Sequence, residues 1–178
     1  TQFGVQVKRA QLMGRQGDVA GARKLLAGLN PADAALQAQA ILAEGQILRD
    51  AGQPKTAYEV LEEGARRFPA NPDLLYDFAL IAEKNGKVAV MEKALREVMV
   101  LAPDNHHAYN ALGYSLAERN VRLAEALALV DKALKMAPED PFIMDSLGWV
   151  HYRMGNLDAA EQQLRRAYAL RDDAEIAV

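Results

Sequence analysis

The sequence reads Asn110-Ala-Leu-Gly-Tyr-Ser-Leu-Ala-Glu-Arg119, and it repeats this pattern 35 residues later as Asp145-Ser-Leu-Gly-Trp-Val-His-Tyr-Arg-Met-Gly155. The same step recurs at Pro69, Pro103 and Pro138, which lie 34 and 35 residues apart. A period of this length is typical of one supersecondary unit copied along the chain, in which each copy buries its apolar face against its neighbours. The chain is therefore predicted to be a solenoid.

Aligned on this period, the copies resemble the tetratricopeptide repeat (TPR), whose signature combines a large apolar residue, a Leu-Gly pair, an aromatic, an alanine and a proline. The fourth copy matches with Leu112-Gly113 and Ala126, and the fifth with Leu147-Gly148 and Ala160. The first copy fits least, because Gln6 stands where an apolar residue belongs. The resemblance implies an all-α fold, a TPR-type right-handed superhelix (α-solenoid) of five helix-turn-helix repeats.

The repeats are predicted at about residues 3–37, 38–71, 72–105, 106–140 and 141–171, as a single TPR array over 1–178. Their helices are predicted at 2–15, 18–29, 33–50, 54–67, 72–85, 87–101, 105–119, 122–136, 140–153 and 156–170. No segment has the pattern of a strand. Residues 172–178 are expected to start a further helix, and because the chain begins at Thr1 without Met we expect a fragment of a longer protein.

Glycines at two kinds of position support this arrangement. Glycine inside a helix costs about 1 kcal/mol relative to alanine, so a recurrent one predicts close approach of another helix. Such positions are Gly45, Gly113 and Gly148 in first helices and Gly64 in a second helix. Gly52, Gly86 and Gly155 follow first helices and are typical of the left-handed conformation that ends a helix. The fourth copy has one extra residue between its helices, so its loop over 118–123 is expected to bulge.

Composition excludes several classes of function. The 178 residues are 51% hydrophobic without a long apolar run, so no membrane span is predicted. A net charge of −3 argues against a nucleic-acid partner. The absence of Cys excludes disulfides and thiol chemistry. The histidines, His106, His107 and His151, fit surface or packing roles better than a metal or general-base role, so we expect neither an enzyme nor a metal or other cofactor.

The candidate site lies on the first helices, which form the inner, concave face of TPR domains. Spacings of three and four residues select one stripe on each first helix. The candidate partner-binding residues on these stripes are Tyr76, Asn110, Tyr114, Asp145, Trp149 and Tyr152. Large aromatics with polar groups are typical interface anchors. The first copy offers Gly4, Val7, Gln11 and Gly14 on the same stripe, so little contact with a partner is expected there.

Two interpretations stay open for part of this set. Trp149 and Phe142 either contact a partner or pack against a neighbouring first helix or a further repeat. Asn110 and Asp145 have no packing reason to lie on the stripe and are the preferred polar contacts. The lysines and asparagines with which chaperone-binding TPR domains clamp a terminal carboxylate are absent, because the matching positions are Val7, Gln11, Leu42, Gln46, Tyr76 and Leu80.

The last two copies also resemble the C-terminal repeats of proteobacterial multi-TPR proteins, many of which are outer-membrane lipoproteins. This resemblance rests on residues 110–119, 145–155 and 165–168. One member type is an adaptor that binds a periplasmic carboxy-terminal processing protease and delivers cell-wall hydrolases to it. The resemblance implies a location in the bacterial envelope, on the periplasmic side of the outer membrane, with the cytoplasm as the alternative.

Two functions therefore remain open from the sequence. The first is a non-enzymatic protein-protein interaction scaffold that binds a peptide or protein in its concave groove, as an envelope adaptor for a protease or cell-wall enzyme. The second is a structural or self-associating repeat segment that flanks a catalytic or secretion domain in the parent chain. Neither the identity of the partner nor the oligomeric state follows from the residues.

Overall fold

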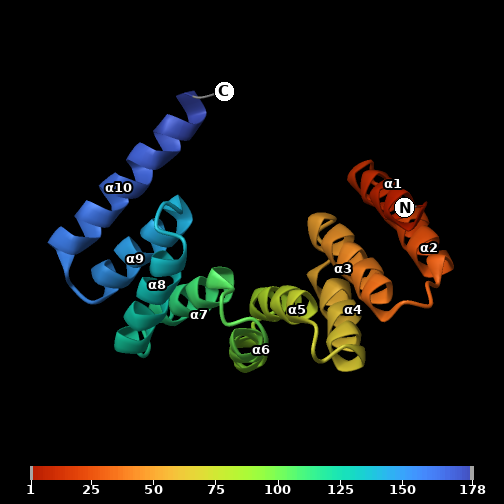
Figure 1. The fold of residues 1–178 in the computed structure, drawn as a ribbon, viewed down its shortest axis with the longest axis horizontal. Helices are drawn as coiled ribbons and strands as arrows, with labels where there is room; N and C mark the ends of the chain where they lie inside the picture. The colour runs from red at the N-terminus through yellow and green to blue at the C-terminus, as the bar shows by residue number, and fades with distance from the viewer. Residues whose placement is uncertain (1, 177–178) are drawn as a thin grey trace. The chain divides into compact units, whose positions relative to one another are not determined.

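The computed structural model of the chain describes residues 2–176, which form ten α-helices and no strand (Figure 1). The helices pair into five hairpins: α1 (Gln2–Arg15) with α2 (Val19–Leu29), α3 (Ala34–Asp50) with α4 (Pro54–Arg67), α5 (Pro72–Lys84) with α6 (Val88–Leu101), α7 (His106–Glu118) with α8 (Leu123–Met136), and α9 (Pro141–Arg153) with α10 (Leu157–Ile176). The all-α fold of five TPR-type hairpins is therefore confirmed.

The helices group into two compact units, residues 1–101 with α1 to α6 and residues 102–178 with α7 to α10. In the first unit α3 packs against both α1 and α2, and α5 packs against both α3 and α4. In the second unit α9 packs against both α7 and α8. Within each unit, a first helix thus covers the hairpin before it, as expected of a solenoid.

The helix ends follow local sequence signals, and the predicted bounds agree with the observed ones to within one residue up to the start of α10. Asn71 and Asp140 cap the N-termini of α5 and α9, with Asp140 accepting a hydrogen bond from the Phe142 N–H at 2.8 Å. α4 and α8 each end two residues before a proline, Pro69 and Pro138.

The last helix departs from expectation. α10 runs without a break from Leu157 to Ile176, whereas a stop near residue 170 and a new helix from 172 were predicted. The reason is that Asp172 occupies the place that proline holds in the three preceding repeats, and neither Gly nor Pro interrupts the helix. Residues 177 and 178 of the predicted further helix lie outside the described residues.

The turns within the hairpins use left-handed residues, as predicted. Gly52, Gly86 and Gly155 have φ of 71°, 73° and 82°. The longer turn between α7 and α8 lacks glycine, and Asn120 and Arg122 take this conformation instead, with φ of 56° and 46°. Asparagine tolerates the left-handed region better than most residues, which explains Asn120, whereas nothing in the sequence explains the left-handed Arg122.

The interior glycines are sites of close helix packing. A Cβ built at Gly113 on α7 would lie 2.5 Å from Val130 Cγ2 and 3.0 Å from the Ala126 carbonyl oxygen, both on α8. The equivalent atom at Gly148 on α9 would lie 2.9 Å from Leu164 Cγ on α10. Gly45 and Gly64 are equally crowded, with the nearest side-chain carbons at 2.8 Å and 2.7 Å. The predicted role of these four glycines is confirmed.

Candidate partner-binding surfaces

Five of the six predicted residues lie on two adjacent helices of the second unit. α7 carries Asn110 and Tyr114, and α9 carries Asp145, Trp149 and Tyr152. Spacings of four, four and three residues place them on one stripe of each helix, and α7 packs directly against α9. We call this surface, defined by these five residues, the aromatic face.

The aromatic face is only partly buried. The side chains of Tyr114 and Tyr152 are 42% and 53% exposed, and Asp145 is exposed as well. Asn110 and Trp149 are half-buried. The face therefore offers ring surface and polar groups to a partner while two of its residues are held within the fold.

The position of Trp149 is fixed by neighbours on its own helix and on α7. Its ring stacks on that of Tyr152, with centroids 5.3 Å apart, and the Arg153 guanidinium lies 5.6 Å from the Trp149 ring centroid. Arg153 Nε also donates a hydrogen bond to the Ala117 carbonyl at 3.1 Å, near the C-terminus of α7. Because helix C-termini have carbonyls without intrahelical partners, this cation binds α9 to α7 and holds the ring pair in place.

Two polar atoms of the aromatic face are buried without a hydrogen-bond partner among the described residues. They are Trp149 Nε1 and Asn110 Oδ1. A buried polar atom without a partner costs about 1–3 kcal/mol. The face is therefore incomplete as a set of hydrogen bonds among the described residues.

The structure also bears on the packing alternative for Trp149 and Phe142. The half-buried Trp149 ring does pack within the second unit, against Tyr152 and Arg153. Phe142 is 68% exposed, and the Arg171 guanidinium covers it at 4.9 Å from the ring centroid. Phe142 thus has a cationic neighbour on α10 rather than a packed first helix.

The sixth predicted residue, Tyr76, lies in the first unit. There α1, α3 and α5 line a hollow of about 340 Å³. The lining residues are Val7, Gln11, Gln39, Leu42, Ala43, Gln46, Asp73, Tyr76 and Asp77. Most of them belong to the predicted stripes, and Val7 and Gln11 form part of the same hollow as Tyr76 although the first copy was expected to offer little. We call this surface the amide hollow.

Electrostatics distinguish the amide hollow. Burial raises the pKa of the Asp77 carboxyl, the attraction of Arg49 opposes this rise, and the neighbouring charge of Asp73 adds to it. Burial also raises the pKa of the Tyr76 hydroxyl, with a further contribution from Asp77. Sequence reasoning missed Asp77, although its position four residues after Asp73 on the same helix is a usable signal.

The described part of the chain contains no group of three or more His, Asp or Glu side chains arranged to hold a metal ion. Within residues 2–176, no helix is both long and apolar enough to cross a membrane. His151 on α9 is half-buried, and its Nδ1 atom has no hydrogen-bond partner among the described residues.

Comparison with known proteins identifies the repeats. Tetratricopeptide repeat models match residues 42–90, 88–141 and 143–173. The TPR repeat-containing protein PA4667 of Pseudomonas aeruginosa is 44% identical over 139 residues, which are 78% of this chain and 24% of the relative. The match thus spans about a quarter of the length of that relative.

Solved structures of MamA share the fold. The structure described as MamA 41-end from Desulfovibrio magneticus RS-1 superposes with a TM-score of 0.77 at 19% identity and covers 97% of both chains. A crystal structure of MamA gives a TM-score of 0.76 at 19% identity, over 93% of this chain and 96% of that one. The matches to known repeats support a protein-protein interaction scaffold. The chain belongs to the tetratricopeptide repeat family.

Proposed function

We propose that this chain is a scaffold that binds a segment of a partner protein on the aromatic face of α7 and α9. The observation that carries the proposal is the pair of buried polar atoms without partners, Trp149 Nε1 and Asn110 Oδ1, beside the exposed rings of Tyr114 and Tyr152. Interface hot spots typically combine rigid aromatic area with such a polar group.

The missing hydrogen bonds describe the partner. The Trp149 N–H requires an acceptor and the Asn110 oxygen requires a donor, and a partner reaches both atoms once these half-buried side chains shift on binding. The backbone of an extended peptide provides both, because each non-proline residue carries one C=O and one N–H. Asp145 adds a carboxylate at the exposed edge and favours a donor or a cation there. We therefore propose an extended segment with apolar side chains that cover the exposed rings.

The amide hollow is proposed as a second contact region, which includes Tyr76. Its three glutamines provide donors and acceptors, and Gln11 Nε2 donates to Gln46 Oε1 at 3.4 Å. No Lys or Arg lines the hollow. This composition favours amide or cationic groups of a partner over a carboxylate.

We further propose that the partner is a protease or cell-wall enzyme of the bacterial envelope, and that the chain works on the periplasmic side of the outer membrane. Support comes from the resemblance of the last two repeats to proteobacterial envelope proteins and from the bacterial relative with 44% identity. Membrane fractionation of cells that produce the full-length protein tests the location. Recovery in the cytoplasmic fraction alone would contradict it.

Trp149 is the only tryptophan, so its fluorescence reports directly on the aromatic face. Partner proteins recovered with the full-length protein are first identified and purified. Each is then titrated into the chain, and a saturable change in Trp149 emission is expected. A partner that binds with unchanged Trp149 emission and unchanged affinity for Asn110→Ala would show that it binds elsewhere.

Trp149→Phe separates binding from stability. The variant keeps a ring to stack on Tyr152 but removes the buried N–H, whose missing hydrogen bond costs about 1–3 kcal/mol. The relief of this cost should offset the packing lost with the smaller ring, so we expect its free energy of unfolding to remain within about 1 kcal/mol of the parent, while affinity for the partner falls. Urea denaturation and calorimetric titration measure the two. A strongly destabilised Trp149→Phe with unchanged affinity would assign the indole a purely structural role.

A further inference from the structure

The amide hollow, which α1, α3 and α5 form in the first unit, has walls of three kinds. Val7, Leu42 and Ala43 form an apolar part, three glutamines supply amides, and Asp73 and Asp77 supply carboxyl groups. With a volume of about 340 Å³, the hollow lies at the small end of the range for ligand pockets, which is about 300–1,000 Å³. A hollow of this size accepts one side chain rather than a helix.

The two carboxyl groups of the hollow lie about one turn apart on α5. Residues four apart on a helix have their Cβ atoms about 5–6 Å apart, so two carboxylates at this spacing repel each other. Neither Asp73 nor Asp77 forms an ion pair with another described residue. A cation placed between them would relieve the repulsion and would be attracted by both carboxylates.

The cationic side chains near Asp77 do not neutralise it. On α3, Arg49 attracts the Asp77 carboxylate, but Arg49 Nε also lies 3.6 Å from Asp50 Oδ1, and Arg49 does not line the hollow. On α1, Arg15 lines an adjoining recess together with Asp50. Burial, with a contribution from Asp73, therefore holds the pKa of Asp77 above its ordinary value of 3.8 in spite of Arg49.

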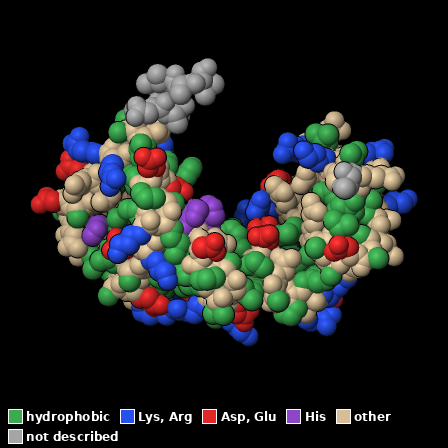
Figure 2. All heavy atoms as spheres, viewed as in Figure 1, with side chains coloured by type: hydrophobic (Ala, Val, Ile, Leu, Met, Phe, Trp, Pro, Cys, Tyr) green, Lys and Arg blue, Asp and Glu red, His purple; other side chains and the backbone are tan. Residues whose placement is uncertain are grey.

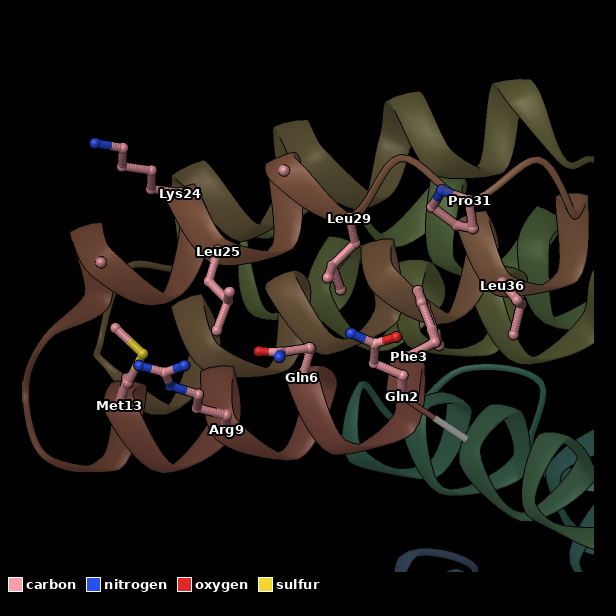
Figure 3. A pocket seen from close by; sticks show the side chains of 12 residues that line it. Gln2, Phe3, Gln6, Arg9, Met13, Lys24, Leu25, Leu29, Pro31 and Leu36 are labelled. Atoms are coloured by element: carbon pink, nitrogen blue, oxygen red, sulfur yellow. The ribbon is translucent and has the colours of Figure 1, made fainter.

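A larger hollow of about 860 Å³, between α1 and α2, differs in kind (Figure 3). Figure 3 shows Leu25 and Leu29 pointing from α2 toward α1, and Figure 2 shows Lys and Arg side chains over both helices. Arg9 in this hollow corresponds to Glu44 one repeat later, and Glu44 pairs with Arg23 of the preceding second helix at 2.7 Å. The larger hollow therefore lies where repeats pack against each other. The amide hollow does not, because its walls are three consecutive first helices that already pack together.

We propose that the amide hollow binds a lysine side chain of the partner protein, with its ammonium group between Asp73 and Asp77 and its methylene stem along Val7 and Leu42. A lysine side chain combines an apolar stem with a compact charge that donates three hydrogen bonds, which fits a hollow with both apolar and acceptor-bearing walls. Arginine is favoured where one carboxylate accepts two parallel hydrogen bonds, whereas the acceptors here belong to separate side chains. The lysine belongs to the partner of the proposed function, on which the inference rests.

Blocked amino acids test the contact: Nα-acetyl-lysine amide, its Nε-acetylated form, and Nα-acetyl-arginine amide. Acetylation of Nε removes the charge and keeps the stem. In NMR titrations of the chain, the lysine probe should shift the side-chain amide signals of Gln11 and Gln46. It should bind at least about threefold more tightly than its Nε-acetylated form, as expected for ion pairs at a partly exposed site. No binding, equal affinity of these two probes, or tighter binding of the arginine probe would overturn the proposal.

Removal of the carboxylates locates the binding. Asp73→Asn with Asp77→Asn should stay folded, because amides of similar shape replace two groups that repel each other, and should bind the lysine probe no more tightly than the Nε-acetylated form. The matched control is Glu59→Gln with Glu97→Gln, which neutralises two exposed carboxyl groups on α4 and α6 of the same unit and should leave the affinity unchanged. Unchanged affinity in the first variant, or an equal loss in the control, would overturn the proposal.

Competition with protons gives a readout that a purely structural role of Asp77 would not change. The ammonium group and a proton compete for this carboxyl, so the lysine probe should bind about twofold or more weakly at about pH 4 than at about pH 7. Arg49 and Arg15 stay charged in this range, and the Tyr76 hydroxyl stays neutral, since its pKa is raised above 10.0. The dependence should persist in Asp73→Asn and largely disappear in Asp77→Asn. Equal affinity of the parent at both pH values would overturn the proposal.

A purified partner separates this inference from the proposed function. Asp73→Asn with Asp77→Asn should weaken partner binding by about three- to tenfold. Parent-like affinity in this variant, with a loss in a folded Trp149→Ala, would overturn the lysine contact and leave the scaffold function in place. A loss in the carboxyl variant, with parent-like affinity in Trp149→Ala, would support the lysine contact and contradict binding on the aromatic face.

Discussion

The aromatic face and the amide hollow use equivalent positions of the repeat and differ in chemistry. Both lie on the first helices of hairpins, α7 and α9 in one unit and α1, α3 and α5 in the other. Tyr114 and Trp149 supply ring surface in the first case, whereas Gln11, Gln46 and Asp73 supply amides and a carboxyl in the second. The hairpin backbone thus places the two surfaces, and the side chains give each its own chemistry.

The two surfaces also differ in how their polar groups are satisfied. On the aromatic face, Trp149 Nε1 and Asn110 Oδ1 are buried without partners among the described residues. In the amide hollow, Gln11 and Gln46 bond each other, and Arg49 acts on the Asp77 carboxyl. We therefore expect the aromatic face to dominate affinity for a partner and the amide hollow to contribute less.

The largest expected effect concerns the packing that supports the aromatic face. Gly113→Leu and Gly148→Leu should each lower the free energy of unfolding by about 1–3 kcal/mol or more, since the new side chain meets Val130 or Leu164 and a facing carbonyl. Urea denaturation measures the loss. Gly28→Leu is the control and should unfold like the parent, because nothing lies within 4 Å of its Cβ. If all three variants were as stable as the parent, α7 and α8, and α9 and α10, would not approach each other closely at Gly113 and Gly148.

A smaller effect is expected where Arg153 holds α9 against α7. Arg153→Met keeps the length of the side chain but removes the hydrogen bond to the Ala117 carbonyl and the cation over the Trp149 ring. Hydrogen bonds to charged groups contribute about 1.5–3 kcal/mol, and partial exposure places the expected loss of stability near the lower end. Thermal unfolding and Trp149 emission should change together. A variant with unchanged thermal unfolding and unchanged Trp149 emission would show that Arg153 does not hold α9 against α7.

The smallest effect distinguishes the amide hollow by its dependence on pH. The pKa of Asp77 is raised above its ordinary value of 3.8, chiefly by burial, so the native state binds more protons than the unfolded state just above that value. Its free energy of unfolding therefore falls as pH rises through this window. Asp77→Asn should raise Tm slightly at neutral pH, with the gain lost in acid where the parent carboxyl is protonated. The gain in Tm is limited because Asp77→Asn also removes the attraction between the Asp77 carboxylate and Arg49.

A matched control for this effect is Asp73→Asn. Asp73 is exposed in the first turn of α5, where a carboxylate favours the helix N-terminus. Its replacement should lower Tm slightly or leave it unchanged at neutral pH. A gain in Tm for Asp77→Asn that persists unchanged to low pH would show that burial of the carboxyl is not its cause.

Much of the fold could be predicted from the sequence because the repeats contain residues that end helices and form turns. Pro69 and Pro138 mark helix ends, and Gly52 and Gly155 occupy left-handed turn positions. The continuation of α10 beyond residue 170 was not predicted, although Asp172 stands where the three preceding repeats have proline and so does not end the helix.

The candidate site was less predictable. Helical spacing identified the stripes that carry Trp149 and Tyr76, but a stripe does not show which polar atoms lack partners or how deeply a carboxyl is buried. Asp77 and the buried N–H of Trp149 emerge only when helices are packed together. Whether the six predicted residues contact a partner stays a prediction.

The choice of controls for that prediction also depends on contacts. Glu62 is a poor control on a second helix, because it accepts a hydrogen bond from the Tyr58 hydroxyl at 2.8 Å. Arg165 on α10 is better, since it is exposed and pairs only with Glu161 on its own helix among the interactions the structure describes. Arg165→Ala therefore changes surface charge without disturbing the packing between helices.

The most direct test of the aromatic face is the affinity of a purified partner for Tyr114→Ala and Trp149→Ala, compared with Arg165→Ala, after circular dichroism has shown that all three are folded. We predict that each aromatic variant loses about 2 kcal/mol or more of binding free energy, as expected of an interface anchor, and that Arg165→Ala binds like the parent. Parent-like affinity in both aromatic variants, together with a loss in Arg165→Ala, would place the binding surface on the second helices and contradict the proposal.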